Sequence, residues 1–228
     1  MDKKIIKIKT LKFLKWLFSC YPEEKALDKD SLENFIMSLK VTSVCKFNAS
    51  LRISLINKSA FITTTIFSLG LILIPLLQMI VKKQVFNNIT YGVVQIFLAV
   101  SVLVYSTIIG TAKYDLRAAE LDRCGVDIKN LIRNIRANKE HGINMEEYTD
   151  KYHDIIKNCE NHTRSDFKRV KLQLTEYFRI TGIKKILFWI EIVGRELIPY
   201  IAPLILILLE VLFILDLLSI TNVFEVFK

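Results

Sequence analysis

The side chains best suited to chemistry lie in the second half of the chain. The three histidines are His141, His153 and His162, and Cys159 stands three positions before His162. That spacing suits one edge of a metal site, but a second pair at ligand spacing is missing, which favours a solvated helix face. The acidic residues of this region alternate with Lys and Arg, as is typical of local ion pairs rather than acid–base catalysis. The sequence also has no glycine-rich phosphate loop and no GxSxG motif, so it predicts no enzyme, no cofactor and no metal.

A cluster of basic residues around Phe167 is a second candidate for chemistry. Its members are Arg164, Lys168, Arg169 and Lys171. Such a patch attracts phosphate, and the formal net charge of +9 agrees with a nucleic acid or nucleotide as partner. A basic surface beside a membrane is equally expected from the positive-inside rule alone. Nucleic-acid or nucleotide binding is therefore possible but unsupported by any motif.

Two long stretches of the chain carry no charged residue. They predict membrane spans at residues 59–81 and 91–112. At ~1.5 Å per residue, the first span reaches ~34 Å, enough for a hydrocarbon core of ~30 Å. The short polar loop between them makes the two helices antiparallel neighbours, so the sequence predicts a transmembrane hairpin in a lipid bilayer.

Several polar side chains lie inside the two predicted spans. They are Thr64, Ser68, Gln78, Gln95 and Ser106. A polar group in lipid needs a partner or water, so these residues face another helix or an aqueous lumen. Packing between helices and lining of a pore both remain open. Two helices cannot enclose a channel, so any pore requires several copies, and we expect a homo-oligomer.

Positive charge predicts the orientation of the hairpin, because the flank with more Lys and Arg stays in the cytoplasm. The connecting loop contains only Lys82 and Lys83. The outer flanks carry Lys46, Arg52, Lys58, Lys113, Arg117 and Arg123. We therefore expect the N-terminus and residues 113–195 to lie in the cytoplasm.

Apolar and small residues repeat with heptad spacing after the second span. The stripe consists of Tyr114, Ala118, Leu121, Gly125, Ile128 and Ile132. This pattern predicts that the second span continues as a long helix packed on another helix, and its small members permit close approach. The long helix is expected to break near residues 141–142. A further helix capped by Asn144 and a helical stretch over residues 166–178 are predicted to follow.

These elements predict an all-α membrane protein with four segments. Residues 1–30 form a basic amphipathic N-terminal segment, expected as a helix on an anionic membrane surface or, alternatively, a disordered basic tail. Residues 31–113 contain a pre-span helix and the hairpin, and residues 114–195 a cytoplasmic helical bundle or coiled coil. Residues 196–228 are hydrophobic, and their apolar helix is either a third membrane segment or a helix buried in an oligomer interface or lying on the membrane.

Three sequence segments resemble one known family. They are KFNASLR at residues 46–52, YDLRAAELDRCGVDIKNL at residues 114–131, directly after the charge-free hairpin, and ENHTRSDFKRVKLQLTEYF at residues 160–178. Together they resemble the SLATT family, the SMODS- and SLOG-associating two-transmembrane effector domains of bacterial conflict systems. The resemblance implies a pore-forming or membrane-perturbing effector in antiviral defence by abortive infection, and it carries over no catalytic residue.

The family resemblance also implies a partner. In such systems a separately encoded sensor, such as a nucleotide-second-messenger synthase or a reverse transcriptase, detects the invader. This chain has no evident sensor domain of its own, so we expect the trigger to come from another protein. The alternative is a membrane anchor or scaffold that forms no pore and recruits a protein or nucleic-acid complex through its basic cytoplasmic helices.

Overall fold

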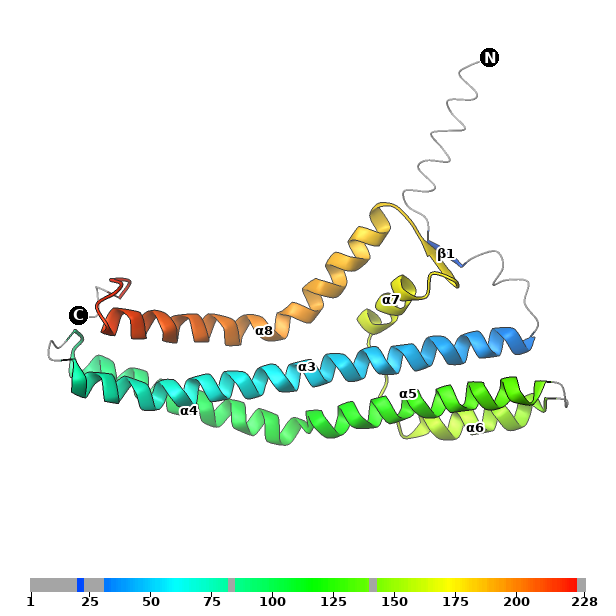
Figure 1. Ribbon diagram of the computed structural model, residues 1–228, viewed down its shortest axis with the longest axis horizontal. Coiled ribbons are helices and arrows are strands. Elements are labelled where there is room, and N and C mark those ends of the chain that lie inside the picture. Colours follow the sequence, from blue (N-terminus) through cyan, green and yellow to red (C-terminus); the bar gives the residue numbers. More distant parts are fainter. Residues whose placement is uncertain (1–19, 23–30, 82–84, 140–142, 225–228) are drawn as a thin grey trace, which may run out of the picture. The chain divides into compact units, whose positions relative to one another are not determined.

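The computed structural model describes residues 20–22, 31–81, 85–139 and 143–224. Along the chain these residues form β1 (Cys20–Pro22), α3 (Ser31–Ile80), α4 (Asn88–Ala112), α5 (Tyr114–Ala137), α6 (Met145–Lys157), α7 (Arg164–Gln173), β2 (Phe178–Ile180) and α8 (Ile183–Leu217) (Figure 1). The all-α class is confirmed, with one antiparallel pair of three-residue strands added to it. Apart from β1, the predicted N-terminal segment lies outside the described residues.

The chain divides into two compact units. The ion-paired unit comprises Met1–Ile53 and Leu116–Glu196, and the hairpin unit comprises Ser54–Asp115 and Leu197–Lys228. Both α3 and α8 contribute residues to each unit. The pre-span part of α3 thus lies in the same unit as the helices that follow the hairpin.

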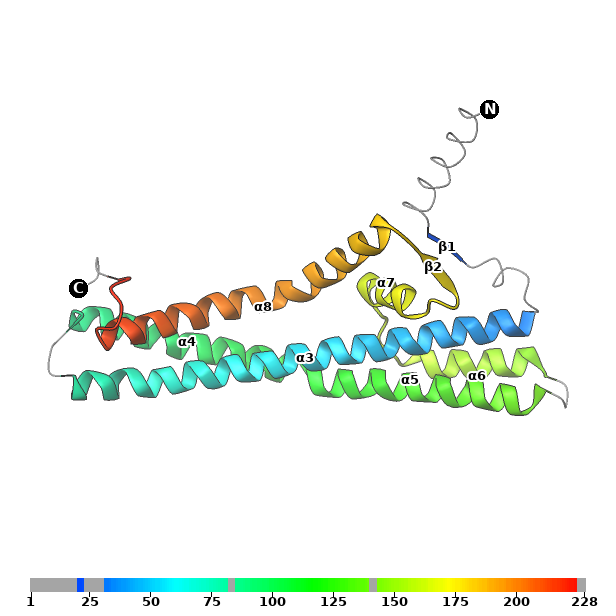
Figure 2. The same cartoon turned by 45° about the horizontal axis from the view of Figure 1, so that its top comes forward.

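The hairpin unit contains the apolar halves of α3 and α8 together with α4, and its elements run alongside one another in Figures 1 and 2. Its core consists of Phe67 and Ile74 of α3, Leu98 of α4, Phe213 and Leu217 of α8, and the nearby aromatic residues Phe86 and Tyr91. Rings of Phe86 and Phe213 stack with their centroids 4.8 Å apart. The unit is thus held together by apolar and aromatic contacts.

Three described helices are long and apolar enough to cross a membrane. They lie within Ser31–Ile80, Asn88–Ala137 and Ile183–Leu217. In an 18-residue apolar stretch of each helix, in the same order, only 28%, 11% and 17% of the residues are buried inside the chain. Most of this apolar surface therefore faces outward. Soluble proteins rarely expose such surface, and a lipid bilayer accounts for it. The membrane hairpin predicted from the sequence is confirmed, and α8 contains a third candidate span.

Both ends of the hairpin loop have local causes. Asn87 caps α4, because its side-chain oxygen accepts a hydrogen bond of 3.3 Å from the backbone N–H of Ile89. The preceding helix, α3, ends at Ile80 and tolerates Pro75 in its interior. The second predicted span, residues 91–112, nearly coincides with α4, and the first, residues 59–81, corresponds to the later part of α3.

The ion-paired unit packs the first part of α3 against α5 and α6. Leu32, Ile36 and Leu39 of α3 form one core with Ile128, Leu131 and Ile135 of α5 and with Tyr148 of α6. The heptad stripe of α5 is buried from Ala118 to Ile132, and Tyr114 at its start is half-buried. The helix that covers this stripe in the structure is α3 of the same chain.

Close approach of α3 and α5 is centred on Gly125. A Cβ atom added there would lie 2.8 Å from Cε1 of Phe47, closer than real side chains tolerate. On either side, Ser43 donates a hydrogen bond of 2.9 Å to the carbonyl of Gly125, and Ser50 donates one of 2.8 Å to the carbonyl of Ala118. Two of the segments behind the family resemblance, residues 46–52 and 114–131, therefore pack directly on each other.

Two sequence predictions about helix ends are wrong. The second span was expected to continue unbroken into the stripe, but α4 ends at Ala112 and Lys113 adopts a left-handed conformation with φ 46° before α5 begins. The helix expected over residues 166–178 ends at Gln173, and Phe178–Ile180 form β2 instead. A sequence pattern missed this strand because its pairing partner, β1, lies more than 150 positions earlier in the chain.

Replacing Gly125 by Leu is expected to destabilise the ion-paired unit by about 1–3 kcal/mol, because the new side chain overfills the contact with Phe47. Asn130 is exposed on the same helix, so Asn130→Leu should change stability by no more than about 0.5 kcal/mol. Thermal unfolding of both variants in detergent measures the difference. Equal effects at the two positions would contradict the packing of α3 on α5.

Candidate functional site

Most polar side chains of the spans satisfy their hydrogen bonds within their own helix. Thr64 donates to the carbonyl of Ala60 at 2.9 Å and Ser68 to that of Thr64 at 2.8 Å, four residues back in each case. Gln78 donates to Asn88 across the hairpin loop over a long 3.5 Å. Gln95 is half-buried, and Ser106 is exposed. Hydroxyl groups bonded in this way can face lipid, so the amides are more informative than the hydroxyls about where water or a partner lies.

The basic patch predicted around Phe167 is largely engaged inside the chain. Lys168 is buried and forms an ion pair with Glu191, and Arg169 forms one with Glu196. The ammonium of Lys171 lies 4.6 Å from the ring centroid of Phe167. Of the four patch residues, Arg164 is exposed, Arg169 and Lys171 are half-buried, and Lys168 is buried. These contacts hold α7 against the first part of α8 and leave little positive charge to meet a phosphate group.

The cysteine and the histidine of the suspected metal edge have different surroundings, because only Cys159 makes a hydrogen bond through its side chain while Nδ1 of His162 has no partner among the described residues. Cys159 donates from its Sγ to the carbonyl of Ile155 at 3.1 Å, and Nδ1 of His162 is buried. In the described part of the chain, no three His, Cys, Asp or Glu side chains gather in a way that would hold a metal ion.

Burial raises the pKa of the Cys45 thiol to about 12 and that of the Cys124 thiol to about 12, so both are poor nucleophiles at neutral pH.

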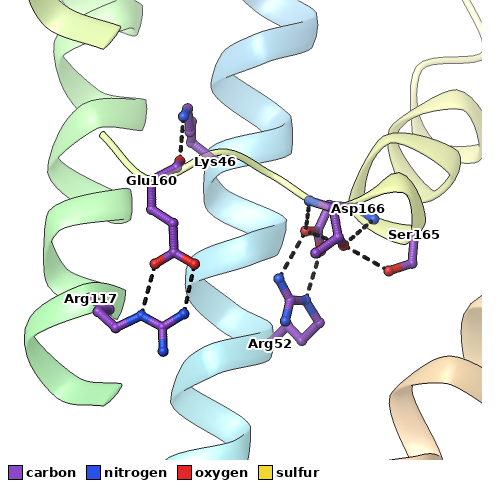
Figure 3. A network of polar contacts seen from close by, with 7 residues as sticks. Lys46, Arg52, Arg117, Glu160, Ser165 and Asp166 are labelled. Carbon is purple, nitrogen blue, oxygen red and sulfur yellow. Dashed lines mark hydrogen bonds and ion pairs between the residues drawn. The ribbon is translucent and has the colours of Figure 1, made fainter. Parts of the chain in front are cut away.

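A network of charged side chains joins α3, α5 and the start of α7 within the ion-paired unit (Figure 3). Its centre is Asp166, at the start of α7, with a side chain only 2% exposed. Arg52 of α3 binds both carboxylate oxygens of Asp166, each over 3.1 Å. Thr163 donates to the same carboxylate from its backbone N–H at 2.8 Å and from its hydroxyl at 2.7 Å. This capping box starts α7 and at the same time ties it to α3.

A second ion pair joins the neighbouring loop to α5. Arg117 binds the two carboxylate oxygens of Glu160 over 2.8 and 2.6 Å. The buried Lys46 of α3 donates to the backbone carbonyl of Glu160 at 2.6 Å. We call the set Lys46, Arg52, Arg117, Glu160, Thr163 and Asp166 the latch. The latch fastens the loop at residues 158–163 to α3 and α5 just beside the points where the chain passes into the hairpin unit.

The pKa values of the latch residues reflect this pairing. Burial alone would raise the pKa of Asp166, but the hydrogen bonds from Arg52 and Thr163 outweigh it and hold that pKa below its ordinary value. The hydrogen bonds from Arg117 likewise lower the pKa of Glu160. Both carboxylates are therefore ionised at neutral pH and bind their arginines as charged, bidentate pairs. Such a site holds the loop and the start of α7 against α3 and α5.

The latch was not predicted from the sequence, where Lys46, Arg52 and Arg117 had been interpreted only as orientation signals. One local signal was available. Thr163 followed three positions later by Asp166 is the pattern of a capping box. The pairing of Asp166 with Arg52 spans 114 positions and leaves no local trace.

These observations define an α-helical membrane protein whose apolar hairpin is joined to an ion-paired helical unit. The chain belongs to the SMODS and SLOG-associating 2TM effector domain family 5, whose family model matches residues 28–216. The SLATT resemblance seen in the sequence is thereby confirmed over most of the chain. Neither a curated protein nor a solved structure gives a significant match. The family description counts two transmembrane segments, whereas three described helices of this chain are long and apolar enough to cross a membrane.

Replacing Asp166 by Asn should destabilise the ion-paired unit by about 2–3 kcal/mol, because it leaves the guanidinium of Arg52 without its charged partner. A fully buried pair would cost about 3–5 kcal/mol, and the partial exposure of Arg52 reduces that figure. The exposed pair of Lys139 and Glu33 provides the control, and Lys139→Met should cost no more than about 0.5 kcal/mol. Unfolding in detergent measures both, and a loss for Asp166→Asn as small as the control's would contradict a stabilising latch.

Acid should weaken the ion-paired unit through His162 before it affects the latch carboxylates. Burial lowers the pKa of His162 below its ordinary 6.5, with a further contribution from Lys46 nearby. Between the folded pKa and pH 6.5 the unfolded chain therefore binds a proton that the folded chain does not, so stability is lost as the pH falls below 6.5.

The measurement is the melting temperature at pH 7.5 and at pH 5.5. His162→Gln should shrink the difference between the two pH values, whereas the same change at the exposed His153 should leave that difference intact. A pH difference that persists undiminished in His162→Gln would refute this assignment.

Proposed function

We propose that the protein is a membrane effector of a bacterial antiphage system. In this proposal several copies assemble in the inner membrane and open a pore, or otherwise perturb the membrane, when a separately encoded partner detects infection. The outcome is growth arrest or death of the infected cell. Membership of a family of two-transmembrane effector domains is the observation that carries the proposal.

The surface of the hairpin unit supports assembly. Exposed large apolar side chains on α4 alone include Ile89, Val93, Ile96, Phe97 and Leu103. Such surface can face lipid or a second copy with little difference in energy, since helices associate in membranes through packing and polar contacts. The half-buried amide of Gln95 lies among these residues and needs a partner or water. We propose that it faces the lumen or a neighbouring copy in the assembly.

The latch provides a plausible point for a partner to act. Arg52 lies two positions before the hairpin unit begins at Ser54, and Arg117 lies two positions after that part of the unit ends at Asp115. A partner that displaces the loop at residues 158–163 together with the start of α7 would free both arginines at once. We propose the cytoplasm as the location of the ion-paired unit, following the excess of positive charge on the flanks of the hairpin.

Membrane polarisation tests the effector role. A potential-sensitive dye, followed in cells in which the complete defence system is triggered, should report depolarisation before growth stops. Gln95→Leu should slow the depolarisation because it removes an amide from the spans, whereas Ile96→Leu replaces one exposed apolar residue by another and should not. Growth arrest with full polarisation would sink the pore and favour the alternative, a membrane anchor that recruits a complex through its helices.

A further inference from the structure

Two free cysteines of the ion-paired unit lie against each other. Cys124 belongs to α5, and Cys159 stands two positions after the end of α6 at Lys157. Both thiols converge on the backbone carbonyl oxygen of Ile155, which lies 3.1 Å from Sγ of Cys159 and 4.0 Å from Sγ of Cys124. A hydrogen bond also joins the two thiols to each other. The two side chains thus already point toward one another, as a disulfide requires.

The two thiols differ in how far they are enclosed. Cys124 is 2% exposed and belongs to the apolar core of the unit, whereas Cys159 is half-buried at the edge of that core. A small solute can therefore reach Cys159, while Cys124 is closed to it. Cysteine pairs that respond to oxidants have this arrangement, in which one accessible sulfur stands next to a second sulfur that resolves it.

A buried cation lies beside the pair. Lys46 of α3 donates a hydrogen bond of 2.6 Å to the carbonyl of Glu160, the residue that follows Cys159. Burial, reinforced by the hydrogen bond to Cys159, raises the pKa of Cys124 to about 12, and the positive charge of Lys46 opposes that rise. Positive charge near a thiol favours the thiolate, which is the attacking form. Lys46 therefore assists Cys124 in any step where its sulfur acts as the nucleophile.

We propose that Cys124 and Cys159 form a reversible oxidation site, which a peroxide converts into a disulfide. In the first step the sulfur of Cys159 attacks one oxygen of hydrogen peroxide and the O–O bond breaks. Cys159 becomes a sulfenic acid, and the other oxygen leaves with the thiol proton as water.

In the second step the sulfur of Cys124 attacks the sulfenic sulfur of Cys159. The S–S bond forms, the S–O bond breaks, and the hydroxyl group leaves with the proton of Cys124 as a second water. Two electrons have then passed from the two sulfurs to the peroxide. The sulfurs are already in contact, so this intramolecular step proceeds although Cys124 is a weak nucleophile. Small thiols reverse the oxidation by exchange, in keeping with the transient disulfides of cytoplasmic redox sensors.

The position of the pair connects oxidation to the latch. Cys159 directly precedes Glu160, whose carboxylate Arg117 binds. Cys124 lies seven positions after Arg117, two turns further along the same face of α5. The disulfide would therefore join the loop at residues 158–163 to α5 by a covalent bond, next to the ion pair that holds it in the reduced chain. This inference does not depend on whether the assembly forms a pore.

Mass spectrometry of the full chain in nanodiscs, before and after treatment with hydrogen peroxide, tests the site. Peroxide should remove two hydrogen atoms from the chain, and digestion without a reductant should give a peptide pair that links Cys124 with Cys159. Dithiothreitol should reverse both changes. Cys45 is buried on α3, and Cys45→Ala should form the same linked pair as the natural chain.

Two further variants separate the roles of the two sulfurs. Cys124→Ala should leave the sulfenic acid of Cys159 unresolved, so that dimedone labels Cys159 at least tenfold more than in the natural chain. Cys159→Ala should leave Cys124 unmodified at the same peroxide concentration, because Cys124 is enclosed. Thermal unfolding without peroxide establishes that each variant is folded. The proposal is overturned if the natural chain gives no linked pair, if Cys159 pairs mainly with Cys20 or Cys45, or if dimedone labels the natural chain and Cys124→Ala equally.

The connection to the latch has its own measurement. Glu160→Gln weakens the ion pair with Arg117, and oxidation of this variant should raise its melting temperature by at least about 5 °C, because the disulfide then holds the loop. The double variant Glu160→Gln with Cys124→Ala should show no such rise. A melting temperature of Glu160→Gln that the disulfide leaves unchanged would refute the connection.

Discussion

Hydrocarbon offers no hydrogen bonds, and this constraint organises the hairpin unit. Every backbone group in a span must be bonded within its own helix, and every polar side chain must find a partner close by. The threonines and serines of α3 meet the requirement by bonding to carbonyls four residues back. Asp216 meets it by capping the chain after α8. Among the charged side chains of the spans, Glu210 is the one that does not meet it within the described residues.

The ion-paired unit follows the opposite rule. Water and salt weaken exposed ion pairs, so their contribution depends on how far they are buried. Pairs such as Lys139 with Glu33 lie at the surface, whereas Asp166 is almost completely enclosed and has four donor contacts from Arg52 and Thr163. The strongest polar contacts of the unit are thus concentrated beside the residues that lead into the spans, where a small displacement of one loop reaches both helices.

Features set by local patterns were predictable from the sequence, and features set by distant pairs were not. The spans follow from runs of uncharged residues, and the N-caps at Asn87 and Asn144 are short-range features. The packing of Phe47 on Gly125, the ion pair of Arg52 with Asp166 and the strand pair β1–β2 each join residues far apart in the chain. The basic patch illustrates the limit of composition, because Lys168 and Arg169 have acidic partners on α8 that a local count of charge overlooks.

The left-handed residue between α4 and α5 has a consequence for helical phase. Side chains along one continuous helix advance by a constant angle, so a stripe on one part predicts the facing side of the rest. At Lys113 the backbone turns out of the helical region for a single residue, and that angle is reset. The heptad positions of the α5 stripe therefore cannot be extended back through Lys113 to predict which side of α4 carries Gln95. The residues of α4 therefore have a helical register of their own, independent of the stripe of α5 that packs on α3.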